Sequence, residues 1–303
     1  MENKNLKYNL PNNLKSKIYE DFNISKLTWF QTGGNVDIFC VVENIYDLKV
    51  ILSYLPKDVK IFILGSGSNI LVRDGGFNGV VFKLGKGFKN LSINNDSVIS
   101  GSAVMDATLA NFALKNSVLG LEFYVGIPGS VGGAIQMNSG CYGSETKDVV
   151  KEVCVIDRFG EEKIISLNEL NFRYRGSSIE KYGIVKEVYF KKNIGNVADI
   201  KSKMNEIINK RRFSQPLGKK TGGSTFKNPE GMFAAKLIEE SDCKGLQSGR
   251  AIISDKHSNF IINQGDATSS DIEILGRKVQ EKVYKKFNVK LEWEIRIIGD
   301  HKK

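Results

Sequence analysis

The stretch that says most about the fold is Gly126-Ile127-Pro128-Gly129-Ser130-Val131-Gly132-Gly133-Ala134. Glycine lacks the Cβ that would block close approach and tolerates positive φ, while Pro128 fixes its own φ and favours an extended Ile127. The pattern predicts a rigid, nearly bare ribbon of backbone, suited to lie against a flat or charged ligand. A tight turn is the alternative that these nine residues leave open.

A second glycine-rich loop, Gly65-Ser66-Gly67-Ser68-Asn69, follows the apolar run 61–64. A dinucleotide fingerprint needs a third glycine that opens a helix, whereas this loop leads into two strand-like runs, 70–72 and 80–84, joined by a glycine turn. Neither glycine-rich segment ends in the Gly-Lys-Ser/Thr of a Walker A loop. We therefore expect both loops to converge on one phosphate-bearing ligand, held by turn amides and by Ser and Asn side chains.

The composition narrows the class of ligand. The chain has 303 residues, enough for two or three domains, and a formal net charge of +10. Such a charge suits nucleic acid, an acidic membrane or an anionic small substrate. The lysines are scattered and the basic clusters are short, which argues against nucleic acid. One region, 210–212 with Lys219, Lys220 and Lys227, is basic enough to attract a polyphosphate.

Cysteine usage and the N-terminal segment indicate the compartment. Cys40, Cys141, Cys154 and Cys243 form no C-x-x-C pair, so reduced thiols are expected. Residues 1–7 lead into no apolar segment, and no run approaches the roughly 18 apolar residues of a membrane span. These observations predict a cytoplasmic location without membrane insertion.

Hydrophobic periodicity predicts an α+β protein in three parts, 1–88, 89–212 and 213–303. The expected strands cover 38–42, 61–64, 80–84, 149–157, 184–190, 260–262 and 291–298, and the expected helices cover 45–55, 106–115, 197–212, 232–240 and 270–287. Ser270 and Glu273 fit a capping box for the last helix. The final strand is a candidate for returning to the first two parts.

Three polar residues are candidates for chemistry. Arg175 lies in a predicted loop, Ser224 follows two glycines that would expose its hydroxyl, and Glu294 stands in an otherwise apolar run. Each also has a plain structural interpretation, namely a surface charge, a turn, and an ion pair with Arg296. Because His257 and His301 are the only histidines, a mechanism without a histidine base is favoured.

Read together, five ordered motifs resemble the UDP-N-acetylenolpyruvoylglucosamine reductases, the MurB family, from about residue 25 to 299. They are 65–69, 126–134, 174–177, 223–229 and 291–299. The resemblance implies a two-part FAD-binding fold of the vanillyl-alcohol-oxidase type (PCMH) plus a C-terminal α+β substrate-binding domain. It further implies bound FAD, NADPH as co-substrate, a UDP-sugar substrate of peptidoglycan synthesis, no nucleic-acid partner and, as the favoured state, a monomer.

The resemblance also assigns residues. It places FAD against Gly65, Ser66, Gly67, Ser68, Asn69, Gly126, Ile127, Pro128, Gly129, Ser130, Gly132, Gly133 and Ala134. It makes Arg175 and Glu294 the groups that bind the substrate carboxylate and developing enolate, and Ser224 the proton donor. The expected substrate contacts are Tyr174, Lys227, Asn228, His257 and Asn259. No metal site is expected.

Some features depart from the family pattern. Cys141 stands where alanine is common, and the bulky Trp293 directly precedes Glu294. The chain also resembles the shorter subtype, which lacks an inserted tyrosine loop. Two other functions stay open on the residues alone, a flavin oxidase on the same fold and a basic nucleic-acid-binding protein.

Overall fold

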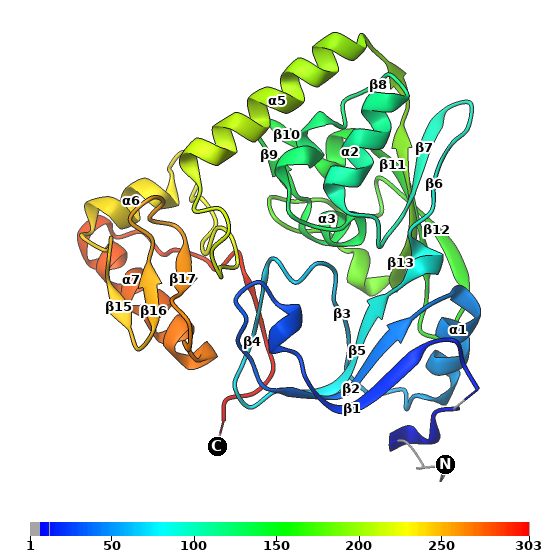
Figure 1. The fold of residues 1–303 in the computed structure, drawn as a ribbon, viewed down its shortest axis with the longest axis horizontal. Coiled ribbons are helices and arrows are strands. Elements are labelled where there is room, and N and C mark those ends of the chain that lie inside the picture. Colours follow the sequence, from blue (N-terminus) through cyan, green and yellow to red (C-terminus); the bar gives the residue numbers. More distant parts are fainter. Residues whose placement is uncertain (1–6, 12, 303) are drawn as a thin grey trace. The chain divides into compact units, whose positions relative to one another are not determined.

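The computed structural model describes residues 7–11 and 13–302, which fold into two compact units (Figure 1). The first unit takes in the described residues up to Glu20, Ile38–Ser66 and Gly79–Lys210. The second consists of Asp21–Asp37, Gly67–Asn78 and the chain from Arg211. Both units mix helices and strands, which confirms the α+β class. The division at 88/89 and 212/213 stays a prediction.

One sheet, which lies mainly in the first unit, has the strand order β1-β2-β5-β3. Its strands are β1 (Lys17–Asn23), β2 (Asn35–Val42), β3 (Ile61–Ile63) and β5 (Phe77–Leu84). Helix α1 (Ile45–Tyr54) begins where Asn44 accepts a hydrogen bond from the Asp47 amide. Its buried face, with Leu48, joins Ile38 of β2 and Phe82 of β5 in one core. The helix and these strands therefore agree with the predicted pattern.

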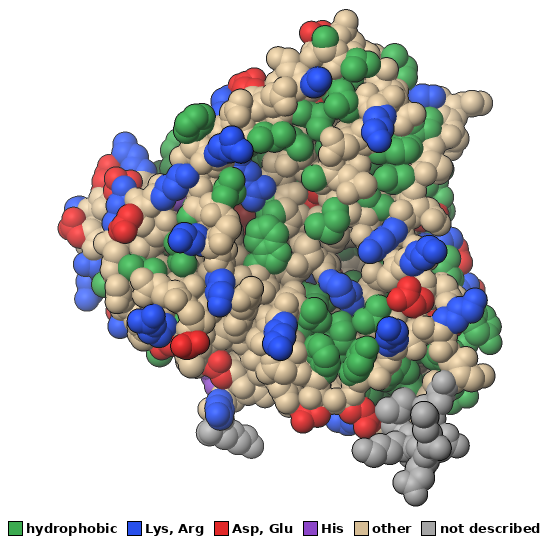
Figure 2. Space-filling view, in the orientation of Figure 1, with side chains coloured by type: hydrophobic (Ala, Val, Ile, Leu, Met, Phe, Trp, Pro, Cys, Tyr) green, Lys and Arg blue, Asp and Glu red, His purple; other side chains and the backbone are tan. Residues whose placement is uncertain are grey.

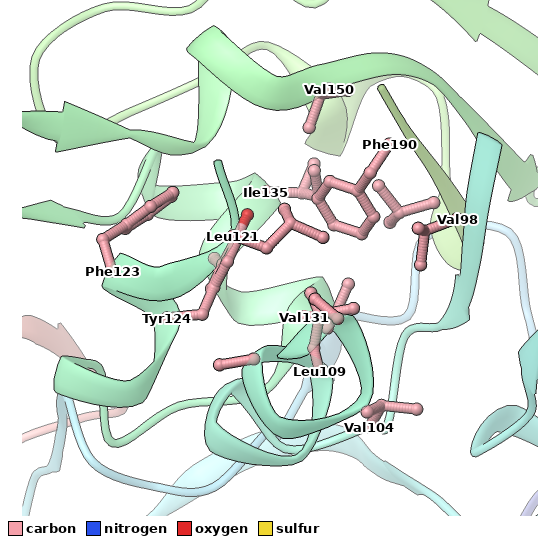
Figure 3. Close-up of a cluster of buried hydrophobic side chains, with 14 of the residues drawn as sticks. Val98, Val104, Leu109, Leu121, Phe123, Tyr124, Val131, Ile135, Val150 and Phe190 are labelled. Atoms are coloured by element: carbon pink, nitrogen blue, oxygen red, sulfur yellow. The ribbon is translucent and has the colours of Figure 1, made fainter. Parts of the chain in front are cut away.

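A second, five-stranded antiparallel sheet completes this unit, in the order β12-β11-β13-β7-β6. Its strands are β6 (Leu91–Ile93), β7 (Ser97–Gly101), β11 (Val150–Ile156), β12 (Glu162–Ser166) and β13 (Ile184–Lys191). Helices α2 (Asp106–Lys115) and α3 (Val131–Met137) contribute Leu109, Val131 and Ile135 to the core that lies between them and Phe190 of β13 (Figure 3).

Short elements connect these parts, and all lie in the described residues. They are the 3-10 turns η1 (Lys7–Asn9), η2 (Ser25–Leu27), η3 (Lys86–Phe88), η4 (Glu122–Gly126) and η5 (Ile179–Lys181), the short strands β8 (Val118–Leu119), β9 (Gly140–Cys141), β10 (Ser144–Glu145) and β14 (Asn193–Ile194), and helix α4 (Thr146–Val149). Helix α5 (Val197–Ser214) follows and carries the boundary between the units. It buries Ile200, Met204 and Ile207, but leaves Ile208 exposed.

The predicted bare ribbon at 126–134 is only half right. Ile127 is extended, with φ −105° and ψ 118°, as the following proline requires. From Val131 onward, however, the chain forms the first turn of α3. Its propensity is low, because two of these residues are glycines. Burial of Val131 and Ile135 overrides that propensity.

The second unit contains a three-stranded sheet and two helices. The strands are β15 (Gln247–Ser248), β16 (Ala251–Ile253) and β17 (Ile261–Asn263), and the helices are α6 (Ala234–Glu240) and α7 (Ser269–Phe287). A further pair, β4 (Ile70–Val72) and β18 (Arg296–Ile298), is parallel. The final strand therefore does pair with an early segment of the chain. Only 296–298 are strand, so the expectation of a strand over 291–298 was too long.

The capping box of α7 differs from the one expected at Ser270 and Glu273. Thr268 caps the helix and exchanges hydrogen bonds with Asp271. Ser270 instead donates to the Asp74 carboxylate from its amide and hydroxyl, at 2.9 and 2.8 Å. Glu273 is buried in an ion pair with Arg73, 2.9 Å away. The two residues of the expected box are thus drawn to partners distant in sequence.

Trp293 fixes the segment that carries Glu294. Its indole packs against the Phe226 ring, with centroids 4.9 Å apart, and over α7 at Gly276. A Cβ on Gly276 would overlap the far edge of the indole. The interior glycine of α7 is therefore required for close packing, and the large side chain that departs from the family pattern has a structural role.

Candidate functional site

The two glycine-rich loops meet within the first unit. Ser66 donates its hydroxyl to the Pro128 carbonyl over 3.1 Å. A Cβ on Gly65 would lie 2.5 Å from the Ser130 hydroxyl oxygen, so a side chain there would force that hydroxyl to move. The expected convergence of the loops is therefore found as direct contact between Gly65–Ser66 and Pro128–Ser130.

Two other glycines of these loops lie against further parts of the chain. A Cβ on Gly67, which has φ +72°, would overlap the Leu27 carbonyl, and one on Gly129 would overlap the Asp106 carboxyl. Gly133 differs, because it is exposed and its Cβ would meet only the Ser130 hydroxyl, at an ordinary 3.5 Å. Of these glycines, Gly133 is the one whose missing side chain leaves open space beside the loops.

Buried polar groups lie behind the ribbon. Among the described residues, the Ser102 hydroxyl and both Asp106 carboxyl oxygens are buried without a hydrogen-bond partner. Burial raises the pKa of Asp106 well above its usual range, which favours a neutral acid. The amides of Val131 and Gly132 are already used by the Val104 and Ser102 carbonyls. Those two amides are therefore not available to a phosphate.

Arg175 is held in the first unit by the chain that follows α3. It has φ +54°, a left-handed conformation that is uncommon outside glycine, in the turn closed by paired hydrogen bonds between Arg173 and Gly176. Its guanidinium donates to the Gly140 carbonyl over 3.1 Å and lies over the Tyr174 ring. The Asn138 side chain binds the Arg173 carbonyl. The ribbon, α3 and the loop 173–176 that carries Arg175 are thus connected by hydrogen bonds and chain continuity.

Ser224 and Glu294 are brought together in the second unit. The Glu294 amide donates to the carbonyl of Thr225, the residue after Ser224, over 2.8 Å. The Glu294 carbonyl accepts a hydrogen bond from the Asn69 side chain at 3.1 Å, and the Arg296 amide donates to the Asn69 carbonyl at 3.0 Å. The loop that carries Ser224 (222–229, the serine loop), the segment around Glu294 and the end of the first glycine loop therefore share one hydrogen-bond network. Ser224 and Glu294 are both half-buried.

Asn259 anchors the serine loop. Its side-chain oxygen accepts from the Phe226 amide at 2.9 Å, its side-chain nitrogen donates to the Phe226 carbonyl at 2.8 Å, and its carbonyl accepts from the Thr225 amide. The residue is 4% exposed. This pattern gives Asn259 a structural role beside Ser224, and its expected contact with substrate stays a prediction.

The other expected substrate contacts also have partners inside the chain. Lys227 pairs with Glu292 at 3.2 Å, and the Asn228 side chain accepts from the Ala234 amide at 3.0 Å. Burial, together with the nearby charge of Lys244, lowers the pKa of His257. His257 therefore stays neutral more readily than a free histidine, and its Nδ1 accepts a hydrogen bond from the Asn259 amide at 3.3 Å.

Sequence reasoning missed three residues that this geometry brings forward. Thr225 joins the serine loop to Glu294, Asp106 lies behind the ribbon, and Lys83 reaches the first glycine loop. Only Lys83 had a visible signal, a cation within the apolar run 80–84. Asp106 stood out merely as the first residue of a helix.

The surface and the remaining residues add little to this site. Figure 2 shows Lys and Arg side chains dispersed over the visible face among neutral ones. No helix within the described ranges is long and apolar enough to cross a membrane. Residues 7–11 and 13–302 also contain no group of three or more His, Cys, Asp or Glu arranged to hold a metal ion.

Family models match both parts of the chain. A model for an FAD binding domain matches residues 36–166, and one for the C-terminal domain of UDP-N-acetylenolpyruvoylglucosamine reductase matches residues 215–298. Together they confirm the expected fold class, an FAD-binding part followed by a C-terminal α+β domain. They also establish FAD as the cofactor of this chain.

Whole-chain relatives agree. The UDP-N-acetylenolpyruvoylglucosamine reductase of Parvibaculum lavamentivorans is 44% identical over 289 residues, which cover 95% of this chain and 93% of the relative. That of Rickettsia rickettsii is 44% identical over 288 residues, 95% of this chain and 98% of the relative. The crystal structure of the reductase (MurB) from Thermus caldophilus aligns with a TM-score of 0.81 at 32% identity, over 93% of this chain and 98% of that one. The chain therefore belongs to the UDP-N-acetylenolpyruvoylglucosamine reductase family.

Proposed function

We propose that Arg175, Ser224 and Glu294 perform the substrate chemistry of this FAD-dependent reductase. The family's reaction is the reduction by NADPH of UDP-N-acetylglucosamine enolpyruvate to UDP-N-acetylmuramate, a step in the synthesis of peptidoglycan precursors. FAD, when bound, would supply the redox chemistry by which hydride from NADPH reaches the enolpyruvyl double bond. The protein must then bind the substrate carboxylate, stabilise the charge that develops, and deliver a proton to carbon.

One observation supports the assignment of Ser224 and Glu294. The Glu294 amide donates to the Thr225 carbonyl at 2.8 Å, and the Glu294 carbonyl accepts from Asn69 at 3.1 Å. The residue next to Ser224, the glutamate and a residue of the glycine loop are thereby held in one hydrogen-bond network. Such support fixes reacting groups in place before substrate binds.

The role of each residue follows from its chemistry. Arg175 presents a permanent cation with several donors, suited to the substrate carboxylate. Glu294, when protonated, donates a hydrogen bond to the enolate oxygen and so stabilises the charge that hydride addition creates. Ser224 gives its hydroxyl proton to the carbanionic carbon, which completes the addition of one hydride and one proton across the double bond.

The residues around the glycine loops suit an FAD molecule. Ser66 and Ser130 bring the two loops into contact, and Gly133 leaves open space at the surface. The orphaned Ser102 hydroxyl and Asp106 carboxyl show that this region contains polar groups whose partners do not come from the described chain. Residues 65–69 and 126–134 would hold the cofactor. Because burial favours the uncharged form of Asp106, this residue would not repel the phosphates of FAD.

The activity is tested by measuring NADPH oxidation with the FAD-loaded protein, with and without the UDP-enolpyruvyl sugar. We expect oxidation to depend on the sugar and UDP-N-acetylmuramate to accumulate in equal amount. Oxidation that needs oxygen and ignores the sugar would instead indicate a flavin oxidase.

The role of Ser224 is tested by separating the half-reactions in rapid mixing. Ser224→Ala should leave reduction of FAD by NADPH nearly intact and slow reoxidation by the enolpyruvyl substrate by roughly 10²–10⁴-fold, the usual cost of losing a general acid. Ser224→Cys, which keeps an acidic proton, should recover part of that rate. Equal slowing of both half-reactions, or an unchanged reoxidation, would remove Ser224 from this role.

Further parts of the proposal concern assembly and substrate contacts. Tyr174, Lys227, Asn228, His257 and Asn259 remain the proposed substrate contacts. A monomer in the cytoplasm is proposed, where NADPH and UDP-sugars are made. The two separate sheets of the first unit support a division of the FAD-binding part near residues 88 and 89, with 213–303 as the substrate-binding domain.

A further inference from the structure

Lys83 is a half-buried cation near the C-terminal end of β5, between the buried Phe82 and Leu84. Its ammonium donates a hydrogen bond to the Gly65 carbonyl over 3.0 Å. Within residues 7–11 and 13–302 it makes no ion pair, although an ammonium has three donors. Burial, with a smaller contribution from Lys89, lowers the pKa of Lys83.

The place of this cation is informative. Gly65 is the residue that presses against Ser130, so Lys83 reaches the point where the two glycine-rich loops touch. Neither loop, 65–69 or 126–134, contains a charged residue. A diphosphate held between them needs positive charge from elsewhere, because desolvating it against neutral backbone alone is costly.

We propose that Lys83 is the cationic contact of the FAD diphosphate, a positioning role outside the three residues assigned to substrate chemistry. The inference rests on FAD binding by the two glycine-rich loops. One of the ammonium donors holds the Gly65 carbonyl and thereby shapes the first loop. The other two face the phosphate oxygens, whose charge compensates the buried cation.

A purely structural role for Lys83 makes a different prediction, and the side chain allows the two to be separated. Glutamine at position 83 keeps a donor for the Gly65 carbonyl but removes the charge, whereas arginine keeps the charge. Lys89 is an exposed lysine close to the end of the same strand, so Lys89→Gln is a matched control for loss of one positive charge.

The experiment titrates apoprotein with FAD and follows quenching of flavin fluorescence at low and high salt. We expect Lys83→Gln to weaken FAD binding by roughly ten- to a hundredfold, the range for losing a charged hydrogen bond, and to flatten its salt dependence. Lys83→Arg and Lys89→Gln should stay within about threefold of the unsubstituted protein. Equal affinities for Lys83→Gln and the unsubstituted protein would overturn the proposal, as would equal weakening by Lys83→Gln and Lys89→Gln.

A second measurement needs no substitution and so remains valid if Lys83→Gln does not fold. The protein is acylated at its amines with and without FAD, and the modified lysines are identified by mass spectrometry. FAD should protect Lys83 and leave Lys89 unaffected. Equal modification of Lys83 in both samples would contradict the proposal. Failure of the unsubstituted protein to bind FAD at all would instead count against the function of the site as a whole.

Discussion

The Asn69 side chain donates a hydrogen bond to the main-chain carbonyl of Glu294 over 3.1 Å, across 225 residues of sequence. Asn69 ends the first glycine-rich loop, and Glu294 is the residue proposed to stabilise the enolate. The Arg296 amide returns a hydrogen bond to the Asn69 carbonyl, so the contact is made in both directions. A residue expected to bind the cofactor thus also sets the position of a residue expected to act on substrate.

This relationship predicts that Asn69→Ala affects catalysis more than cofactor binding. Loss of the hydrogen bond releases the Glu294 carbonyl and should cost about 1 kcal/mol in unfolding free energy. Because a small displacement of a reacting group is expensive, we expect reoxidation of the reduced enzyme by substrate to slow by about tenfold or more. Rapid mixing measures that step. A variant with reduced FAD occupancy but normal reoxidation would contradict this assignment.

The glycines of the ribbon predict two different outcomes. Gly129→Ala forces a Cβ onto the buried Asp106 carboxyl, so it should unfold the apoprotein at lower temperature whether or not FAD touches the ribbon. Gly133→Ala meets only an ordinary contact at 3.5 Å and adds a good helix former to α3, so the melting temperature of the apoprotein should stay the same or rise.

The informative readout for Gly133→Ala is therefore FAD affinity in a normally folded protein. If FAD lies against this glycine, affinity should fall by about tenfold, because the added methyl group occupies space that the ligand needs. Calorimetric titration of the apoprotein measures it. Unchanged affinity would place the cofactor away from Gly133 and restrict its contact to the loop residues before α3.

The sequence was enough to predict those helices whose formation depends mainly on residues near one another in the chain. The helix expected at 106–115 is α2 with the same bounds, and the helix expected at 45–55 is α1, which ends one residue earlier. The ribbon was half wrong, because burial of Val131 and Ile135 drives a glycine-rich segment into a helix. Propensity alone cannot report such packing.

For the site, the sequence indicated which residues take part, but it did not indicate which residues they contact. The motif order pointed to Ser224 and Glu294, but nothing local indicates that Thr225 and Asn69 join them. The capping box shows the same limit. Asp74, almost 200 residues upstream, takes the amides of Ser269 and Ser270 and so displaces the expected start of α7. Long-range partners of this kind leave no periodic signal in the sequence.

The packing of Trp293 on α7 reverses a general rule about glycine. Replacing a helix-interior glycine by alanine usually stabilises a protein by about 0.5–1 kcal/mol. At Gly276 the new Cβ would overlap the indole of Trp293, so Gly276→Ala should instead destabilise by about 1–3 kcal/mol. Urea unfolding measures this. In the double variant with Trp293→Phe the overlap is relieved, and most of the loss should disappear. Additive losses would exclude the contact as the cause.

The buried carboxyl of Asp106 predicts a pH dependence of stability. Its raised pKa means that the folded protein keeps a proton that the unfolded chain releases above about pH 4. The stability it contributes is complete below that pH and is lost as pH rises through the folded-state pKa, by at most about 1.4 kcal/mol per pH unit. Asp106→Asn does not titrate. Relative to the unsubstituted protein it should therefore gain stability steadily as pH is raised from 5 to 7.

Denaturant unfolding of both proteins across that pH range measures the difference, in which all other titrating groups cancel. Asp106→Leu, also neutral, should show the same slope with a different offset, since only the titration is shared. A difference independent of pH would mean that Asp106 ionises equally in the folded and unfolded chains. In that case a negative charge would stand directly behind Gly129, where it would repel a bound diphosphate, and FAD affinity should rise in Asp106→Asn.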